Sequence, residues 1–267
     1  MPESATNFDD RALLCLWPQR MMFIGRLGTL PLHRHPISVC LVALQTPLRV
    51  STAMAGESMV CLTAIVPAGL SHSLDLSGAP VAVIYNDPDD PYYRRLSPHQ
   101  ECGLSSLDPE IEGSLIVAVR NVYASHQAGD KLRFDDFDVA AERALGIEPR
   151  PLRLDVRVER VVSMIRADID RNHSIEELAR RVDLSPSRLQ HLFVQEIGVP
   201  LRTFRIWIRF RHAVERVGDG DSITSAALDA GFSSSSHFSH AFKATFGATA
   251  ASVLKGPPSR VRIQLIQ

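Results

Sequence analysis

The residue types that perform catalysis are not arranged for catalysis in this 267-residue sequence. It contains no nucleophile paired with a base, no glycine-rich phosphate loop and no pair of catalytic carboxylates in a known motif. The four cysteines, at positions 15, 40, 61 and 102, include no C-x-x-C pair, which argues against a zinc cluster. We therefore predict that the chain is not an enzyme. The side chains that remain able to do chemistry are histidines in the first half and arginine, glutamine, serine and histidine in the second.

Charge is distributed unevenly along the chain. Residues 1–150 hold 12 Lys and Arg against 18 Asp and Glu, a net −6, whereas residues 151–267 hold 17 against 12, a net +5. A basic domain attracts the phosphates of nucleic acid, so the second half is a candidate for binding DNA or RNA. A positive charge of this size also occurs on an ordinary solvated surface, and the charge alone leaves both interpretations open. The acidic start, MPESATNFDD, and the lack of a long apolar run predict a cytoplasmic protein with no membrane partner.

An internal repeat is the most informative feature of the second half. SIEELARRVDLSPSRLQHLFVQEIG, residues 174–198, returns as SITSAALDAGFSSSSHFSHAFKATFG, residues 222–247, at an offset of 48 residues that becomes 49. Each copy has a short helix with a small alanine, then a turn, then a second helix with large apolar residues. This is the spacing of a helix-turn-helix unit, in which the second helix projects outward. The pair Ser185-Pro186 predicts where the first projecting helix begins.

Other parts of the sequence must position these groups. Short apolar runs over residues 22–85, separated by Pro, Gly, Ser and His, predict strands of a β-barrel or sandwich. An apolar stripe at helical spacing follows, and we favour dimerisation over packing against the barrel as its role; it consists of Ile111, Leu115, Val119 and Val122.

The two prolines of GIEPRPLRLD, residues 146–155, together with the change of charge, predict a domain boundary. We thus expect an α+β fold with a sensor domain at 1–148, a helical domain at 149–255 and a loosely ordered tail at 256–267. The sensor domain would include the helical segment at about 105–146.

Residues 153–254 resemble the DNA-binding domain of the AraC/XylS family of bacterial transcription regulators. The resemblance rests on the two repeated units, on RFRHA in the helix that connects them and on DAGFSSSSHFSHAFKATFGA near the end. It implies that the two projecting helices enter successive major grooves on one face of DNA. The implied base-edge residues are Ser187, Arg188, Gln190, His191, Ser235, Ser236, His237 and His240, and the implied backbone contacts are Arg209 and Lys243.

The implied readers are chemically unequal. Arg suits guanine O6 and N7 and Gln suits adenine N6 and N7, whereas Ser and His have weak base preference. The first unit, with Arg188 and Gln190, should therefore discriminate between DNA bases more strongly than the second unit. His240 stands where the family more often has arginine, and ATAASVLKG replaces the usual Ser-Pro pair and arginine after Gly247, so the final helix is expected to be less well fixed.

The first half resembles a cupin-type sensor domain. The resemblance rests on His33-x-His35 after Gly28 and on Pro67-x-Gly69-x-x-His72, and it implies that the three histidines converge inside a small β-barrel. They could supply three metal ligands with a fourth position open. The glutamate and the asparagine expected near the two motifs are absent, so we predict an organic-ligand or metal-free site and no cofactor.

Together these features predict a sequence-specific transcription regulator that responds to a small molecule. Its expected partners are double-stranded DNA, a small-molecule effector and a second copy of the chain in a homodimer. We also expect it to contact RNA polymerase, because we predict an activator of transcription. The alternative is a metal-dependent cupin-type enzyme that carries a DNA-binding domain, against which the missing glutamate counts.

Overall fold

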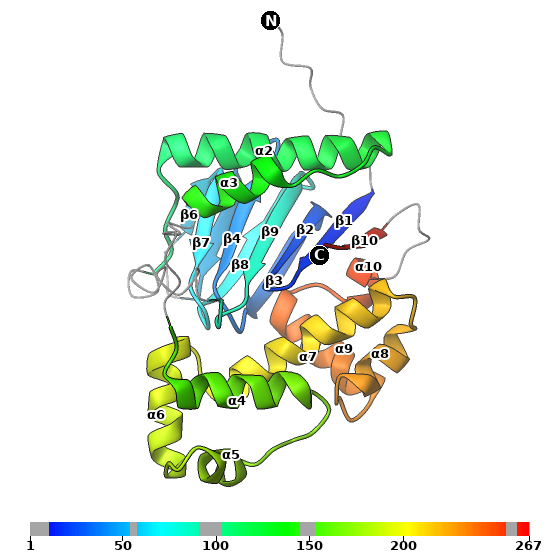
Figure 1. Cartoon of the computed structure of the whole chain (residues 1–267). Helices are drawn as coiled ribbons and strands as arrows, with labels where there is room; N and C mark the ends of the chain where they lie inside the picture. Colours follow the sequence, from blue (N-terminus) through cyan, green and yellow to red (C-terminus); the bar gives the residue numbers. More distant parts are fainter. Residues whose placement is uncertain (1–10, 54–57, 91–102, 145–152, 255–260, 267) are drawn as a thin grey trace, which may run out of the picture.

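The computed structural model describes residues 11–53, 58–90, 103–144, 153–254 and 261–266 (Figure 1). The first half contains two facing sheets, whose inner side chains share one core. The six-stranded sheet has the order β10-β1-β2-β9-β4-β7 and the four-stranded sheet has the order β3-β8-β5-β6. The strands are β1 (Ala12–Trp17), β2 (Arg20–Arg26), β3 (Thr29–Arg34), β4 (Val39–Ala43), β5 (Leu48–Thr52), β6 (Ser58–Cys61), β7 (Thr63–Val66), β8 (Ser71–Asp75), β9 (Pro80–Asn86) and β10 (Val261–Leu265).

The central strands of the six-stranded sheet are buried on both faces. Along β1, Leu14 and Leu16 point into the space between the sheets, while Leu13 and Cys15 point to the opposite face. Successive side chains of a strand alternate between faces, so a continuous apolar run is stable only where both faces are covered. This is why the sequence reads as short apolar runs rather than as an alternating pattern.

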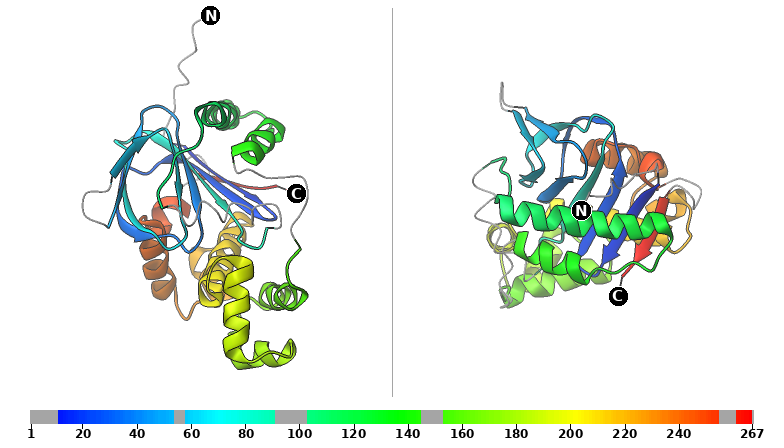
Figure 2. Two further views of the ribbon diagram at one scale, coloured as in Figure 1. Left: turned by 90° about the vertical axis from the view of Figure 1, so that its left-hand side faces the viewer. Right: turned by 90° about the horizontal axis from the view of Figure 1, so that it is seen from above.

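Two helices cover the outer face of that sheet. They are α2 (Pro109–Ala128) and α3 (Asp135–Ala144), seen above the sheet in Figure 1 and beside it in Figure 2. The stripe predicted to mediate dimerisation lies here: Leu115, Val119 and Val122 are buried against the sheet, and Ile111 packs at the edge of the same cluster. The dimer role expected for this stripe is therefore wrong, because the outer face of the sheet already covers it.

The second half is helical, as predicted, and the two repeated units are present. Its helices are α4 (Val156–Ala167), α5 (Ile175–Arg181), α6 (Pro186–Ile197), α7 (Leu201–Gly218), α8 (Ile223–Asp229), α9 (Ser235–Phe246) and α10 (Ala250–Leu254). The first unit is α5 with α6, the second is α8 with α9, and α7 connects them. This confirms the α+β fold. Most of the predicted boundary at 146–155, namely residues 146–152, lies outside the part of the chain that the structure describes.

Near its C-terminus the chain adds a last strand, β10, to the edge of the six-stranded sheet. Val261–Leu265 pairs in parallel with β1, with Ile263 opposite Leu14. Ile263 also packs on α7, because Gly218 leaves room for it: a Cβ on Gly218 would lie 2.8 Å from Ile263 Cγ2. The prediction of a loosely ordered tail is thus wrong for these residues.

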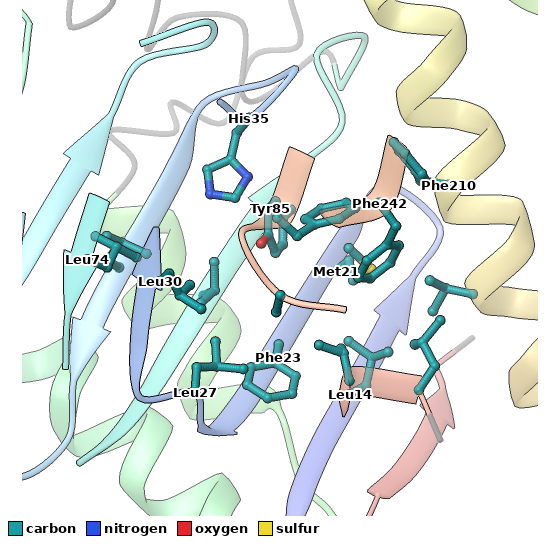
Figure 3. Close-up of a pocket in the computed structure, with 17 residues that line it drawn as sticks. Leu14, Met21, Phe23, Leu27, Leu30, His35, Leu74, Tyr85, Phe210 and Phe242 are labelled. Carbon is teal, nitrogen blue, oxygen red and sulfur yellow. The ribbon is translucent and has the colours of Figure 1, made fainter. Parts of the chain in front are cut away.

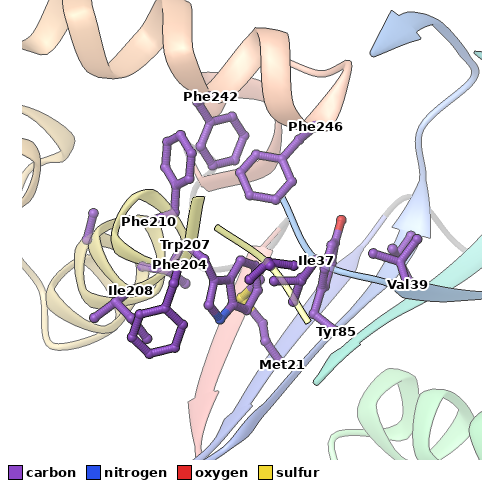
Figure 4. Close-up of a cluster of buried hydrophobic side chains, with 14 of the residues drawn as sticks. Met21, Ile37, Val39, Tyr85, Phe204, Trp207, Ile208, Phe210, Phe242 and Phe246 are labelled. Carbon is purple, nitrogen blue, oxygen red and sulfur yellow. The ribbon is translucent and has the colours of Figure 1, made fainter. Parts of the chain in front are cut away.

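The helical half packs directly on the six-stranded sheet. The Trp207 ring of α7 stacks on the Tyr85 ring of β9, with the centroids 5.5 Å apart, and Phe246 of α9 lies 5.8 Å from Tyr85 (Figure 4). A polar contact lies beside these rings. Asp87, fully buried after β9, accepts hydrogen bonds from Trp207 Nε1 at 2.8 Å and from Arg166 Nη2 at 2.7 Å. The two halves therefore share both an apolar core and an ion pair between the buried Asp87 carboxylate and the half-buried Arg166.

Candidate DNA-reading surface and sensor cavity

Helix α6 is built to present one face to a partner. Ser185 caps it by accepting a hydrogen bond from the Arg188 backbone N–H at 3.2 Å, Pro186 occupies its first turn, and the left-handed Gly198 ends it. Its inward residues are buried in the helical core: Leu189, Leu192, Phe193 and Ile197. All four residues predicted to meet base edges are exposed on the other side: Ser187, Arg188, Gln190 and His191.

Helix α9 has the same design with smaller polar side chains. Ser234 caps it through the His237 backbone N–H at 3.1 Å, and its three phenylalanines are buried. Ser236, His237 and His240 are exposed, as is the predicted anchor Lys243, whereas Ser235 is half-buried. The His237 ring is held in place: its Nδ1 lies 3.0 Å from Ser233 Oγ and its ring packs edge-on against Phe232.

Arg209 sits differently from the other implied contacts. It is half-buried in α7, and its Nε donates to the Ile169 carbonyl at 3.3 Å, which joins α7 to the end of α4. A Cβ at Gly231 would approach its Cζ to 3.2 Å, so the guanidinium also packs on the turn between α8 and α9. Burial lowers the pKa of Arg209 from its usual value. The structure thus gives this residue a structural task that the sequence did not indicate.

The three histidines of the first half do converge. His33 of β3 pairs with His72 of β8 across the four-stranded sheet, and His35 follows two residues later. All three are buried, and one ring nitrogen from each lies within 4.8 Å of the others. Burial lowers the pKa of His72 to about 4 and holds the pKa of His35 well below its usual range, an effect to which the neighbouring rings add. The cluster is therefore a set of neutral imidazoles.

An apolar cavity lies between the two facing sheets and the helical half (Figure 3). The six-stranded sheet contributes residues such as Met21, the four-stranded sheet contributes Leu30 and Leu74, α7 contributes Phe210, and α9 contributes Phe242. The polar side chains among the residues that line it are those of His35 and Tyr85, and its described lining includes no arginine or lysine. The cavity volume is about 40 Å³. Of the residues that the sequence predicted for a ligand site, His35 lines this cavity; sequence reasoning missed the other walls, because they come from both ends of the chain.

Comparisons with known proteins agree with this architecture. Residues 178–256 match the family model of a helix-turn-helix domain, and the match spans α6 to α10. The chain is a DNA-binding transcription regulator with an AraC-type helix-turn-helix domain. The regulator is similar in fold to unsaturated fatty acid bound wild-type ToxT from Vibrio cholerae, with a TM-score of 0.56, 15% identity, and 88% of this chain and 94% of that chain covered.

Two further solved structures are similar to the regulator, one over most of the chain and one over a smaller part of it. ToxT from Vibrio cholerae O395 bound to (E)-4-(8-methylnaphthalen-1-yl)but-3-enoic acid has a TM-score of 0.56 at 15% identity, with 86% of this chain and 96% of that chain covered. A transcriptional regulator with an AraC-type DNA-binding domain from Chromobacterium violaceum is 27% identical, covers 38% of this chain and 96% of its own, and has a TM-score of 0.34.

Among the helices that the structure describes, none has the length and apolar character needed to cross a membrane.

Proposed function

We propose that the regulator reads two successive major grooves with α6 and α9 and that an apolar small molecule alters this reading. The observation that carries the proposal is the shared cavity, because one of its walls is the inner face of α9. Phe242 and Phe246 line the cavity, while His240 and Lys243 stand exposed on the same helix. A molecule that enters between the sheet and α9 therefore touches the helix that presents the second set of readers.

The size of the cavity suggests how binding is communicated. Ligand sites are commonly about 300–1,000 Å³, whereas this cavity has a volume of about 40 Å³. An effector must therefore separate α9 and α10 from the sheet to be accommodated. A ligand shifts a conformational equilibrium by its difference in affinity for the two states, and here the state with the second unit displaced is the one with room.

The lining favours an effector whose body is apolar. Apart from His35 and Tyr85, its lining side chains are hydrocarbon, aromatic or thioether groups. ToxT, which has a similar fold, has been crystallised with an unsaturated fatty acid and with a naphthalene-containing acid. We infer that a long-chain hydrocarbon compound is the best first probe for this chain as well.

A cavity-filling variant tests the response to the effector. Full-length protein is titrated on DNA selected from a random library, with and without oleic acid or oleyl alcohol. We expect a probe to change DNA affinity by about 5–150-fold, the usual range of coupling between two sites. Val253→Phe, in the half-buried cavity wall on α10, should abolish the change, whereas Val139→Phe, on the exposed side of α3, should preserve it. An equal response in both variants would place the effector elsewhere.

The readers and the anchors should respond differently to alanine substitution. Arg188→Ala and Gln190→Ala should each relax sequence preference in one half of the DNA site by about 1–3 kcal/mol, because bidentate base contacts are lost. Lys243→Ala should weaken binding to all sequences alike and lower the salt slope by about 1. Binding selections at several salt concentrations measure both effects, and protection should appear about 10 base pairs apart on one face.

Arg209→Ala needs a folding control, because the same side chain holds the Ile169 carbonyl. A loss of binding with an unchanged melting temperature would support a phosphate contact for it. Equal loss of specificity from reader and anchor variants, or protection of a single groove, would refute the two-groove assignment.

A further inference from the structure

The position of the proton on His35 follows from its neighbour. His33 Nδ1 lies 2.8 Å from the Pro31 carbonyl, and because a carbonyl oxygen only accepts, this nitrogen carries the proton of the neutral His33 ring. His33 Nε2 is therefore an acceptor, and its contact with His35 Nε2 at 3.2 Å requires His35 Nε2 to donate. The neutral His35 ring thus carries its proton on Nε2 and a lone pair on Nδ1.

This lone pair has no donor among the described residues. His35 is 2% exposed, and its Nδ1 makes no hydrogen bond within the part of the chain that the structure describes. The ring points into the apolar cavity (Figure 3). There it packs edge-on against Tyr85, with the centroids 5.5 Å apart, and lies 5.9 Å from the Phe246 ring. Because a buried polar atom without a hydrogen bond is destabilising, the cavity offers an acceptor to any molecule that can donate to it.

The Tyr85 hydroxyl supplies the complementary group. Tyr85 lines the same cavity beside His35, and burial raises the pKa of its phenol above the usual value, so the hydroxyl stays protonated. A phenolic O–H can donate a hydrogen bond. The two polar side chains of the described lining are therefore one acceptor and one donor, both uncharged, and that lining includes no lysine or arginine to neutralise an anion.

We propose that the effector is a neutral long-chain alcohol whose hydroxyl lies between His35 and Tyr85. A hydroxyl can donate to His35 Nδ1 and accept from Tyr85 at the same time, whereas an ether oxygen only accepts. A carboxylate also only accepts, and it would lose its hydration without meeting a cation in the described lining. This inference rests on the proposed effector site and names the chemical class of its ligand.

Three probes with the same hydrocarbon chain test this class: oleyl alcohol, its methyl ether, and oleate at pH 8. Equilibrium dialysis against the full-length protein measures each dissociation constant, at concentrations below those at which the probes aggregate. We expect oleyl alcohol to bind about 2–10-fold more tightly than the methyl ether, the effect of one neutral hydrogen bond. It should bind at least about tenfold more tightly than oleate, because the lining leaves a buried charge unpaired.

Two substitutions assign the hydrogen bonds to their side chains. His35→Phe and Tyr85→Phe each remove one polar group and keep an aromatic ring, so each should weaken binding of oleyl alcohol by about 2–10-fold. Only Tyr85→Phe should also weaken binding of the methyl ether, because the ether has no proton to donate to His35. His212→Phe, on α7 and outside the described cavity lining, should leave the order of the three probes unchanged.

The outcomes separate this inference from the proposed effector site. Oleate that binds as tightly as oleyl alcohol, or equal affinities for the alcohol and its ether, would overturn the neutral alcohol, while an effect of either probe on DNA affinity would still support the effector site. A preference for oleyl alcohol without any effect on DNA affinity would support the hydroxyl position and refute the coupling to DNA. Binding of none of the probes would overturn both. If a variant does not fold, the three probes on the wild type still decide the ligand class.

Discussion

Asp87→Asn should lower the free energy of unfolding by about 3–5 kcal/mol, the cost of removing one partner of a buried ion pair. Asp87 is fully buried and contacts three donors from the helical half: Trp207 Nε1, Arg166 Nη2 and, at 3.4 Å, Arg211 Nη1. Without the carboxylate, the Arg211 guanidinium, 4% exposed, would be left with carbonyl groups and Glu215 as its partners. The loss should fall on the contact between the halves, so urea unfolding followed by fluorescence and circular dichroism should show two separated transitions.

Asp89 provides an internal comparison for this prediction. It binds the same Arg166 through two hydrogen bonds, at 2.9 and 2.7 Å, but it does not contact Trp207. Asp89→Asn should therefore cost less than Asp87→Asn, because Asp87 would still pair with Arg166. Arg133→Gln, which breaks an exposed pair with Asp135 at 3.7 Å, should change stability by no more than about 1 kcal/mol. An Asp87→Asn variant as stable as Arg133→Gln would show that the buried contact does not join the halves.

Phe210→Ala should cost about 3–5 kcal/mol, the usual range for a buried phenylalanine that leaves a cavity. Its ring is completely buried, and it contacts the rings of Phe232, Phe238, Phe242 and Phe246 with centroids 5.2–5.9 Å apart. It therefore holds the second unit to α7 and forms part of the wall of the apolar cavity. Thermal and urea unfolding of the full-length chain would measure the loss.

Two further substitutions serve as controls for the loss of stability in Phe210→Ala. Phe210→Leu keeps much of the volume and should cost less, whereas Val139→Ala, at an exposed position, should stay within about 0.5 kcal/mol. Because the change enlarges the cavity, Phe210→Leu should also bind oleyl alcohol at least as tightly as the wild type. A Phe210→Ala variant with unchanged stability would mean that the aromatic cluster closes over the gap.

Local features were predictable because their causes lie within a few residues. Ser185 caps α6 through the backbone N–H three residues away, as the pair Ser185-Pro186 predicted, and the buried leucines and phenylalanines of α6 and α9 follow helical periodicity. The repeat also located those two helices, and all but one of the side chains predicted to meet base edges are exposed on them, Ser235 being half-buried. The resemblance to a cupin-type domain likewise indicated that His33 and His72 would meet, and β3 pairs with β8 at these positions.

What the sequence by itself determined is therefore the α+β class, the two helix-turn-helix units and the faces of their helices. The tertiary structure alone decided which apolar surfaces meet: the stripe around Val119 covers the sheet, Ile263 fills the space beside Gly218, and Asp87 pairs with arginines about 80 and 120 residues later. An apolar stripe has the same periodicity whether it covers a sheet or a second subunit. A carboxylate likewise carries no local sign of a distant partner, because that pairing depends on long-range packing.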